Sequence, residues 1–268
     1  MVKLFRIAAP AIALVTFLVP AAAHEMWIAP FKYQLPAGKN IRADLRNGEN
    51  FNGNQLAYFS RTSKRIEVAG PAGRADLAPR DGDRPAFDID VNTPGLHVLA
   101  YESTPARITY KEAAKWAKFV KHKDLGEVAA QHSARGLPAQ GFKEGYTRHA
   151  KALVASGSGM GADRELGLET EFVALTNPYD GAYSGQMSLK LLYKGKLRPN
   201  AQVEVFEQSD DNRVRVFMTR TNANGVASIR TKPGHSYLVD AVVLRVPESG
   251  DTRVAWETLW AALTFKHP

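Results

Sequence analysis

The sequence IRADLR at positions 41–46 decides the fold class, because apolar Ile41, Ala43 and Leu45 alternate with charged residues. Successive side chains of a β-strand point to opposite faces, so this alternation predicts a strand with one buried face. The pattern ends at Asn47-Gly48, a pair that is common in tight turns. We therefore expect the surrounding sequence to form β-structure as well.

Short strands of the same kind are predicted in both halves of the chain. In the first half they lie at residues 55–61, 65–69, 86–91 and 95–102, with turns at 70–73 and 81–83. In the second half they lie at 168–175, 188–193, 202–207, 213–220, 226–230, 236–245 and 258–265, with a turn at 222–225. Such spacing is typical of sandwiches. The fold prediction is mainly β, with two antiparallel immunoglobulin-like or prealbumin-like β-sandwiches and an inserted helical hairpin.

The hairpin is predicted where the pattern becomes helical. Residues 110–123 place Ala113, Trp116, Ala117 and Val120 at helical spacing, and a second helical piece spans 125–134. Residues 146–155 fit either a strand or a helix, and the glycine-rich run at 156–161 is interpreted as a linker. The predicted organisation is a signal peptide at 1–23, an N-terminal sandwich at 24–105, a helical insertion with linker at 106–161 and a C-terminal sandwich at 162–268.

The first 23 residues have the layout of a cleaved secretory signal. Lys3 and Arg6 precede an almost wholly apolar segment, and Ala21-Ala22-Ala23 supplies the small residues that a signal peptidase needs. The chain has no cysteine, which excludes disulfides and a cysteine-linked lipid anchor. We therefore predict a periplasmic protein without direct membrane insertion.

The charge of the chain is basic but dispersed. The formal net charge is +8, and removal of Lys3 and Arg6 with the signal lowers it by two to +6. The basic residues are spread along the sequence rather than concentrated in one segment, and an exported protein rarely meets nucleic acid. We expect a solvated basic surface and no nucleic-acid partner.

Cleavage after Ala23 would make His24 the first residue of the mature protein. Its free α-amine and its imidazole would then lie at one point, and both groups bind transition metals. With a second imidazole they would form a histidine brace, a T-shaped set of three nitrogens that suits Cu(II) and Ni(II). We therefore predict a metal site anchored by His24.

Two histidines are candidates for the second imidazole. His97 lies on one face of a predicted strand and is either a metal ligand or a packed core residue. His235 begins a predicted strand near a sandwich edge, and it too is either a ligand or a structural residue. His149 is disfavoured because its neighbours Arg148 and Lys151 would repel a cation. The remaining histidines are interpreted as surface or mobile residues: His122, His132 and His267.

Two carboxylates are candidates to complete the metal site. Glu25 is adjacent to His24, and Asp240 lies in an otherwise apolar strand, where a charged group must be paired, exposed or functional. Asp240 has the alternative of pairing with an arginine. The predicted metal ligands are therefore His24, His97, His235, Glu25 and Asp240.

Several stretches resemble a known family. They are His24-Glu25-Met26-Trp27, the sequences YTRHAKAL at 146–153 and WETLWAALTF at 256–265, and the turns Asn222-Ala223-Asn224-Gly225 and Pro233-Gly234. Together they resemble domain-of-unknown-function family 4198, whose exported members are often described as periplasmic components of nickel or cobalt uptake systems. The resemblance covers nearly the whole mature chain. It implies β-sandwich domains in the periplasm and a divalent-metal role beside a membrane-bound uptake system, although the chain lacks a histidine-rich tract.

Three functions follow as hypotheses. The first is a periplasmic protein that binds nickel, cobalt or copper for metal uptake or handling. The second is a non-catalytic β-sandwich module that binds a protein or glycan partner. The third is a copper-dependent polysaccharide oxidase. We predict no enzyme, since a cysteine nucleophile, a Gly-x-Ser-x-Gly elbow and a His-Glu-x-x-His motif are missing, and Trp27, Trp256 and Trp260 are interpreted as core aromatics.

Overall fold

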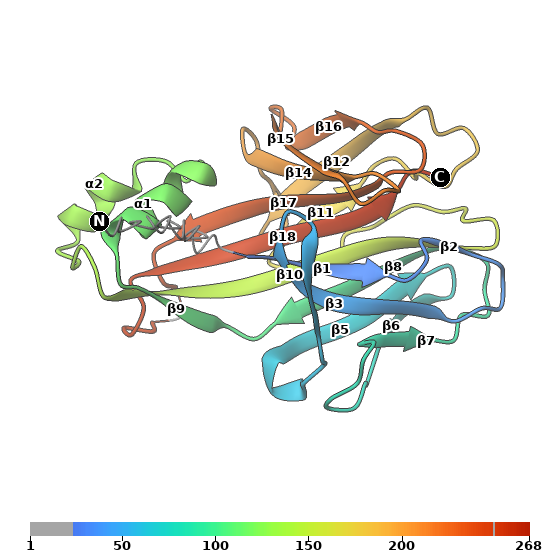
Figure 1. Ribbon diagram of the computed structural model, residues 1–268, viewed down its shortest axis with the longest axis horizontal. Helices are drawn as coiled ribbons and strands as arrows, with labels where there is room; N and C mark the ends of the chain where they lie inside the picture. Colours follow the sequence, from blue (N-terminus) through green and yellow to red (C-terminus); the bar gives the residue numbers. More distant parts are fainter. Residues whose placement is uncertain (1–23, 249) are drawn as a thin grey trace, which may run out of the picture.

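The chain folds into three β-sheets and a pair of short helices (Figure 1). The computed structural model describes residues 24–248 and 250–268, so the predicted signal peptide lies outside the described residues. In the described part, the prediction of a mainly β chain with sandwiches and two inserted helices is confirmed. No helix of that part is long and apolar enough to cross a membrane.

The central sheet has ten strands and connects the two halves of the chain. Its main path runs, in order, through β15 (Val214–Arg220), β14 (Gln202–Gln208), β17 (Ser236–Arg245), β18 (Trp256–Lys266), β10 (Phe142–Ser156), β8 (Gly95–Ser103), β5 (Ser63–Gly70) and β6 (Gly73–Asp76). The short strands β2 (Gln34–Leu35) and β9 (Ala106–Tyr110) pair with opposite ends of β10. The pairs of β10 with β18 and with β2 are parallel, whereas the other described pairs are antiparallel.

Two four-stranded sheets cover opposite faces of the central sheet. One contains β1 (Glu25–Pro30), β3 (Ile41–Glu49), β4 (Asn52–Leu56) and β7 (Phe87–Ile89), and the other contains β11 (Thr170–Ala174), β12 (Gln186–Tyr193), β13 (Lys196–Leu197) and β16 (Val226–Arg230). Strand β10 contributes alternate side chains to the two cores on either face of the central sheet. Ala152 and Val154 belong to the core under the first flanking sheet, and Leu153 and Ala155 to the core under the second. The two sandwiches therefore share one sheet.

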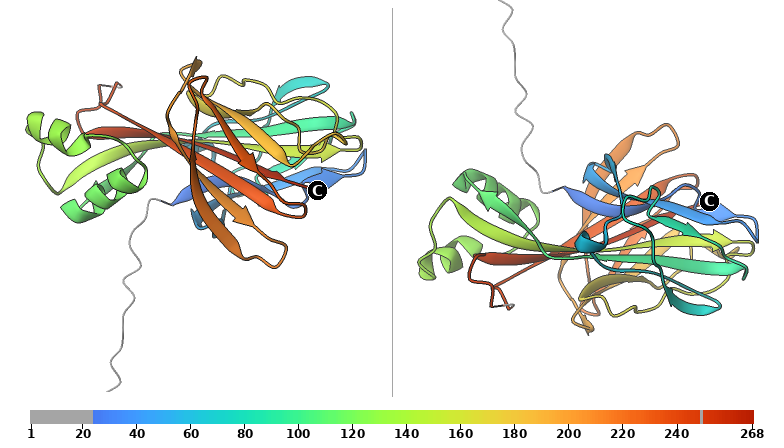
Figure 2. Two further views of the ribbon diagram at one scale, coloured as in Figure 1. Left: turned by 90° about the horizontal axis from the view of Figure 1, so that it is seen from above. Right: turned by 90° about the horizontal axis from the view of Figure 1, so that it is seen from below.

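The helical hairpin lies at one end of the long strands β10 and β18 (Figure 2). Helix α1 (Ala113–His122) buries Trp116, as the spacing predicted, and also Phe119, whereas Ala113 and Ala117 are exposed and Val120 is half-buried. Trp116 is stacked 6.3 Å from Trp256 and Phe119 is stacked 5.8 Å from Trp260 between ring centroids. Helix α2 (Val128–Ala134) completes the hairpin, and a single 3-10 turn, η1 (Ser60–Thr62), precedes β5. The burial of Trp27, Trp256 and Trp260 agrees with their interpretation as core aromatics.

One histidine of the hairpin is buried, contrary to its interpretation as a surface residue. His132 Nε2 donates to the Pro138 carbonyl at 2.9 Å, and its Nδ1 accepts from Trp256 Nε1 at 3.0 Å. A polar side chain can be buried in an apolar cluster when both of its hydrogen-bonding atoms are satisfied.

The domain boundaries predicted at 105/106 and 161/162 do not coincide with boundaries of the central sheet. The range 106–161 holds β9 and the fifteen-residue β10 as well as the helices, so the helical insertion is shorter than predicted. Because β10 is buried on both faces, its sequence lacks the alternation that identifies a strand with one exposed face. The glycine-rich segment packs against the sheet, since a Cβ on Gly159 would lie 2.8 Å from that of Ala155.

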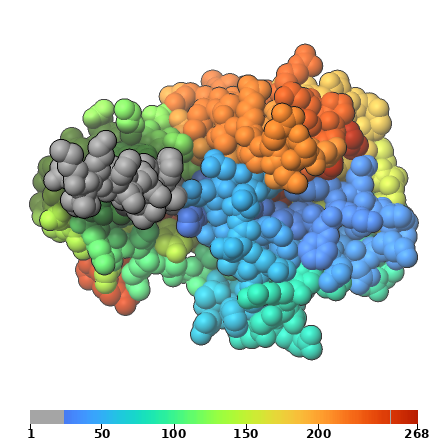
Figure 3. All heavy atoms as spheres, in the orientation of Figure 1, coloured from blue at the N-terminus to red at the C-terminus, as the bar shows by residue number. Residues whose placement is uncertain are grey.

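Distant parts of the sequence meet on the face shown in Figure 3, where the β3–β4 region (blue) lies beside the β14–β15 region (orange). A cleft of about 760 Å³ lies between them. The aromatic residues Trp27, Phe31, Tyr33 and Phe51 contribute to its lining.

We expect Lys151→Met to destabilise the protein strongly. The Lys151 side chain is 1% exposed, and its Nζ lies 2.9 Å from Asp163 and 3.3 Å from Glu171. Its loss leaves two buried carboxylates unpaired, which should lower the free energy of unfolding by about 3–5 kcal/mol in urea denaturation. The control Lys190→Met removes a lysine that is 24% exposed and paired with Glu165, and should cost at most about 1 kcal/mol. Equal losses in the two variants would contradict this prediction.

Candidate functional site

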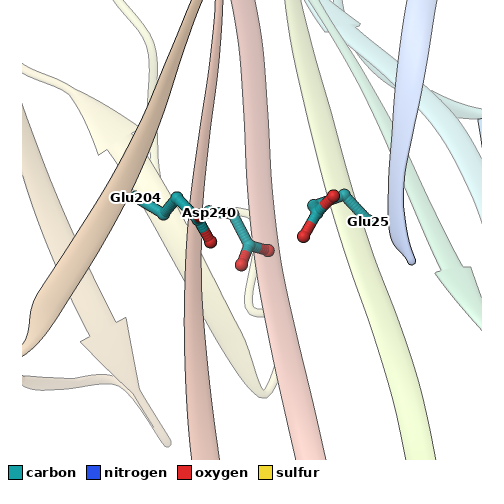
Figure 4. Close-up of side chains that lie close together, drawn as sticks. All are labelled: Glu25, Glu204 and Asp240. Atoms are coloured by element: carbon teal, nitrogen blue, oxygen red, sulfur yellow. The ribbon is translucent and has the colours of Figure 1, made fainter. Parts of the chain in front are cut away.

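Three carboxylates from three strands converge on one face of the central sheet. They belong to Glu25 at the start of β1, Glu204 on β14 and Asp240 on β17, and one oxygen of each lies within 4.8 Å of one oxygen of each other. Figure 4 shows their side chains pointing toward one another. All three residues are buried, and we call this group the acidic cluster.

Strand pairing and strand packing bring the acidic cluster together. Glu204 and Asp240 are direct partners in the β14–β17 pair, so their side chains share one face of the sheet. Strand β1 packs across the same face, where Thr264 on β18 donates a hydrogen bond to the Ile28 carbonyl at 2.7 Å. Glu25, at the start of β1, therefore reaches the other two carboxylates from above the sheet.

The ammonium group of Lys123 lies among the three carboxylates. Its Nζ is 3.1 Å from Glu25, 2.5 Å from Glu204 and 2.9 Å from Asp240, and it lies 4.8 Å from the centre of the Trp260 ring. Lys123 follows the last residue of α1, so the helical hairpin delivers this cation to the sheet.

Two further cationic side chains border the acidic cluster. His122 Nε2 donates to the second oxygen of Glu204 at 3.0 Å, and its side chain is half exposed. Arg148, on β10, is buried with its guanidinium 3.9 Å from the centre of the Trp260 ring, and its Nε and Nη1 make no hydrogen bond. Arg148 therefore offers the acidic cluster a nearby positive charge without a direct hydrogen bond.

The pKa values of the acidic cluster reflect this surplus of carboxylates. Burial raises the pKa of Glu25 to about 7, although Lys123 opposes the shift, and burial likewise raises the pKa of Asp240. Burial also acts to raise the pKa of Glu204, but the hydrogen bond from His122 and the charge of Lys123 outweigh it and lower that pKa. The hydrogen bond to Glu204 raises the pKa of His122. Protonation of one of its carboxylates, or a bound cation, therefore stabilises the acidic cluster.

This geometry comes close to what a divalent metal requires. Carboxylate oxygens bind such metals at about 2.0–2.2 Å. Each oxygen would therefore have to move toward the present position of the ammonium by about 0.3–1.1 Å, and Lys123 would have to leave. Three carboxylates with a nearby imidazole form a donor set of oxygen and nitrogen, which first-row divalent metals accept. The residues present therefore fit a divalent cation that displaces the ammonium.

The model of a family described as a domain of unknown function, DUF4198, matches residues 21–245. The chain belongs to this family. The DUF4198 description names no activity, but it confirms the family resemblance seen in the sequence. No curated protein matches the chain.

Solved structures align with this DUF4198 protein only loosely. A tandem-repeat segment from the extending region of a large adhesion protein covers 91% of the chain at 10% identity with a TM-score of 0.23, and the chain spans half (50%) of that segment. The D0-D1 domains of intimin align over 89% of this chain and 97% of theirs, at 13% identity and a TM-score of 0.19. Two fibronectin type-III domains of chicken tenascin give the same coverages, 89% and 97%, at 9% identity and a TM-score of 0.21. Scores this low support no inference about the site.

Of the five predicted ligands, Glu25 and Asp240 meet in the acidic cluster. His24 lies directly before Glu25, with a side chain that is 54% exposed, and its Nε2 is 3.3 Å from Glu49. The expected α-amine of His24 would therefore belong to the residue directly before Glu25.

The two histidines predicted to complete a brace have other partners. His97 is buried with its Nε2 3.0 Å from the Thr93 carbonyl, and burial lowers its pKa. His235 Nδ1 lies 3.1 Å from Glu207, near Lys232. The structure therefore does not assemble His24 with either histidine.

Sequence reasoning missed the partners of Asp240. Glu204 lies in the predicted strand 202–207 between Val203 and Val205, where the alternation of polar and apolar residues is typical of an exposed face, so its burial was a weaker signal than that of Asp240. No comparable signal marked Lys123, one of several lysines on the polar side of a helix. The expected pairing of Asp240 with an arginine is replaced by an ion pair with Lys123.

We expect Lys123→Met to destabilise the protein more at pH 8 than at pH 5. Without the ammonium, the carboxylates of the acidic cluster bind protons more tightly in the folded than in the unfolded state, so stability is lost as the pH rises through their folded-state pKa values. Guanidinium denaturation should show a loss of about 3–5 kcal/mol at pH 8 and a smaller loss at pH 5. Lys121→Met, on an exposed residue of the same helix, is the matched control. A loss of the same size at both pH values would contradict the predicted role of Lys123.

Proposed function

We propose that this protein binds a divalent transition metal, nickel or cobalt in the first place and copper as an alternative, at the acidic cluster beside His24. In this proposal the metal is a cargo that the protein holds in the periplasm for a membrane-bound uptake system. The observation that carries the proposal is a buried group of three carboxylates that already encloses a cation, the Lys123 ammonium.

Charge balance supports a dication at this position. With Lys123 in place, three carboxylates face two permanent cations, Lys123 and Arg148, and His122 completes the balance only when it is protonated. A divalent metal in place of Lys123 would neutralise the carboxylates together with Arg148. Burying uncompensated charge is costly, so a neutral site is favoured.

The donor set supports a first-row transition metal. Glu25, Glu204 and Asp240 supply carboxylate oxygens. The imidazole of His122 contacts Glu204 at 3.0 Å through Nε2 and would have to release the proton on that nitrogen to become a further ligand. Imidazole suits nickel, copper and zinc better than it suits magnesium or calcium. If the mature chain begins at His24, its α-amine and imidazole add nitrogen donors at the start of β1.

Metal titration of the protein that begins at His24 tests this proposal. Ni(II) and Co(II) binding, followed by calorimetry, should weaken by at least about tenfold in Glu204→Gln and in Asp240→Asn, because each removes a charged ligand. The exposed Glu165→Gln is the matched control and should bind as the wild type does. Absence of binding by the wild type, or unchanged affinity in both cluster variants, would contradict the proposal.

The same titration should depend on pH. Because the pKa of Glu25 is about 7, a proton competes with the metal below that pH, and affinity should rise by about tenfold per pH unit up to pH 7.

A variant with one extra residue ahead of His24 separates the two parts of the site, the acidic cluster and the α-amine. Unchanged affinity in this variant would exclude the α-amine as a ligand and leave the acidic cluster as the site.

A second candidate function is the binding of a glycan in the cleft between the β3–β4 region and the β14–β15 region. The cleft of about 760 Å³ combines aromatic residues with amide side chains, Gln34, Asn52, Gln208 and Asn212. Its volume lies in the range of small-ligand sites, which place a few polar groups beside apolar walls.

Phe31→Ala tests glycan binding in the cleft. Phe31 is exposed, so its truncation should weaken the binding of an oligosaccharide without a loss of stability. The binding would be followed on an array of oligosaccharides, with Ile108→Ala, at another exposed apolar residue, as the control. If neither the wild type nor the variants bind any oligosaccharide, the cleft is not a glycan site.

A further inference from the structure

His149 has a buried nitrogen without a hydrogen-bonding partner. Its Nδ1 lies 3.1 Å from the carbonyl oxygen of Trp260. A carbonyl oxygen only accepts hydrogen bonds, so Nδ1 carries a proton, and in the neutral ring Nε2 presents a lone pair. The side chain is 0% exposed, and Nε2 makes no hydrogen bond. Burial lowers the pKa of His149 and so favours this neutral form.

The lone pair of His149 faces a carboxylate. Oε1 of Glu102, on β8, lies 3.7 Å from His149 Nε2, and Glu102 is also buried. Two acceptors that face each other without a proton between them repel. Lys64 contacts the same oxygen at 2.7 Å, but its side chain is 63% exposed, so this ammonium approaches from the solvent and not from between the two acceptors.

A metal ion matches this separation. Nitrogen and oxygen ligands lie about 2.0–2.2 Å from Zn²⁺, and two ligands of a tetrahedral ion are therefore about 3.4 Å apart. The observed separation is 3.7 Å. Metal-bound histidines usually donate their other N–H to a carbonyl or carboxylate, as Nδ1 of His149 does. A cavity of about 370 Å³, lined in part by Glu102 and Ser103, adjoins this carboxylate.

The charged neighbours that disfavoured His149 in the sequence do not oppose a cation here. Arg148 points to the opposite face of β10, because successive side chains of a strand alternate. Lys151 shares the face of His149, but Asp163 and Glu171 neutralise its charge. Near His149, Glu169 contributes a negative charge and Lys64 a positive one.

We propose that His149 and Glu102 form a site for a first-row divalent transition metal, with water as the remaining ligands. This site lies on the other face of the central sheet from the acidic cluster. It stands on its own contacts and does not depend on the proposed function.

Histidine side-chain ¹⁵N spectra of the mature chain, titrated with Zn(II), test this site. The His149 Nε2 resonance should shift on metal binding, whereas the Nε2 resonance of His97, which contacts the Thr93 carbonyl, should not. Glu102→Gln should weaken the effect by at least about tenfold, since loss of a group that only supports a metal ligand already costs about 10–100-fold. Lys64→Gln is the matched control, because it removes the ion pair with Glu102 and keeps both proposed ligands.

Two results would overturn the proposal. One is a His149 resonance that does not move at millimolar Zn(II), which would mean that an internal water or nothing occupies the space. The other is a shift of equal midpoint in Glu102→Gln and in the wild type, which would mean that Glu102 is not a ligand. Glu204→Gln should leave the His149 titration unchanged, so failure at the acidic cluster and failure at His149 are distinguishable.

Discussion

The parallel pairing of β10 with β18 is the interaction on which the rest of the structure depends. It runs over nine paired positions, from Glu144 with Trp256 to Ala152 with Thr264. Because β8 pairs with one side of β10 and β17 with the other side of β18, this pair joins the strands of both halves into one sheet. A flanking sheet then covers each face, and the helices pack on the end of the strands that extends past these sheets.

The helical hairpin and the central sheet are coupled by charge as well as by apolar packing. The Lys123 ammonium contacts residues that are 81 to 117 positions away in the sequence. Removal of either side of such a buried ion pair leaves the other side uncompensated. The position of the hairpin and the protonation of the acidic cluster therefore depend on each other, and a metal would compete with both the proton and the ammonium.

Strand alternation separates two kinds of chemistry that are adjacent in the sequence. Arg148 faces the aromatic core and the acidic cluster, whereas His149 faces Glu102 on the other side of the sheet. Adjacent residues of a strand therefore face different sites, whereas Lys151, two residues after His149, shares its face and is neutralised there by Asp163 and Glu171. For this reason, the sequence neighbours of His149 were a poor guide to its electrostatic surroundings.

The sequence by itself determined the class of the fold, the inserted helices and two residues of the acidic cluster. Alternation at 41–46 and helical spacing at 110–123 are local periodicities, and they predict elements without knowledge of their partners. Glu25 stood out because it follows His24, and Asp240 because a carboxylate in an apolar strand is costly to bury. Strand β10 did not stand out, because burial on both faces removes the period of two.

Only the tertiary structure decided which charged groups meet. The register between β14 and β17 places Glu204 opposite Asp240, and the packing of α1 brings Lys123 to both. His24, His97 and His235 each contact another partner, and the arrangement of β8 and β10 places Glu102 3.7 Å from His149 Nε2. Contacts between residues that are far apart in the chain depend on register and on packing between sheets, and a single sequence carries no local pattern for either.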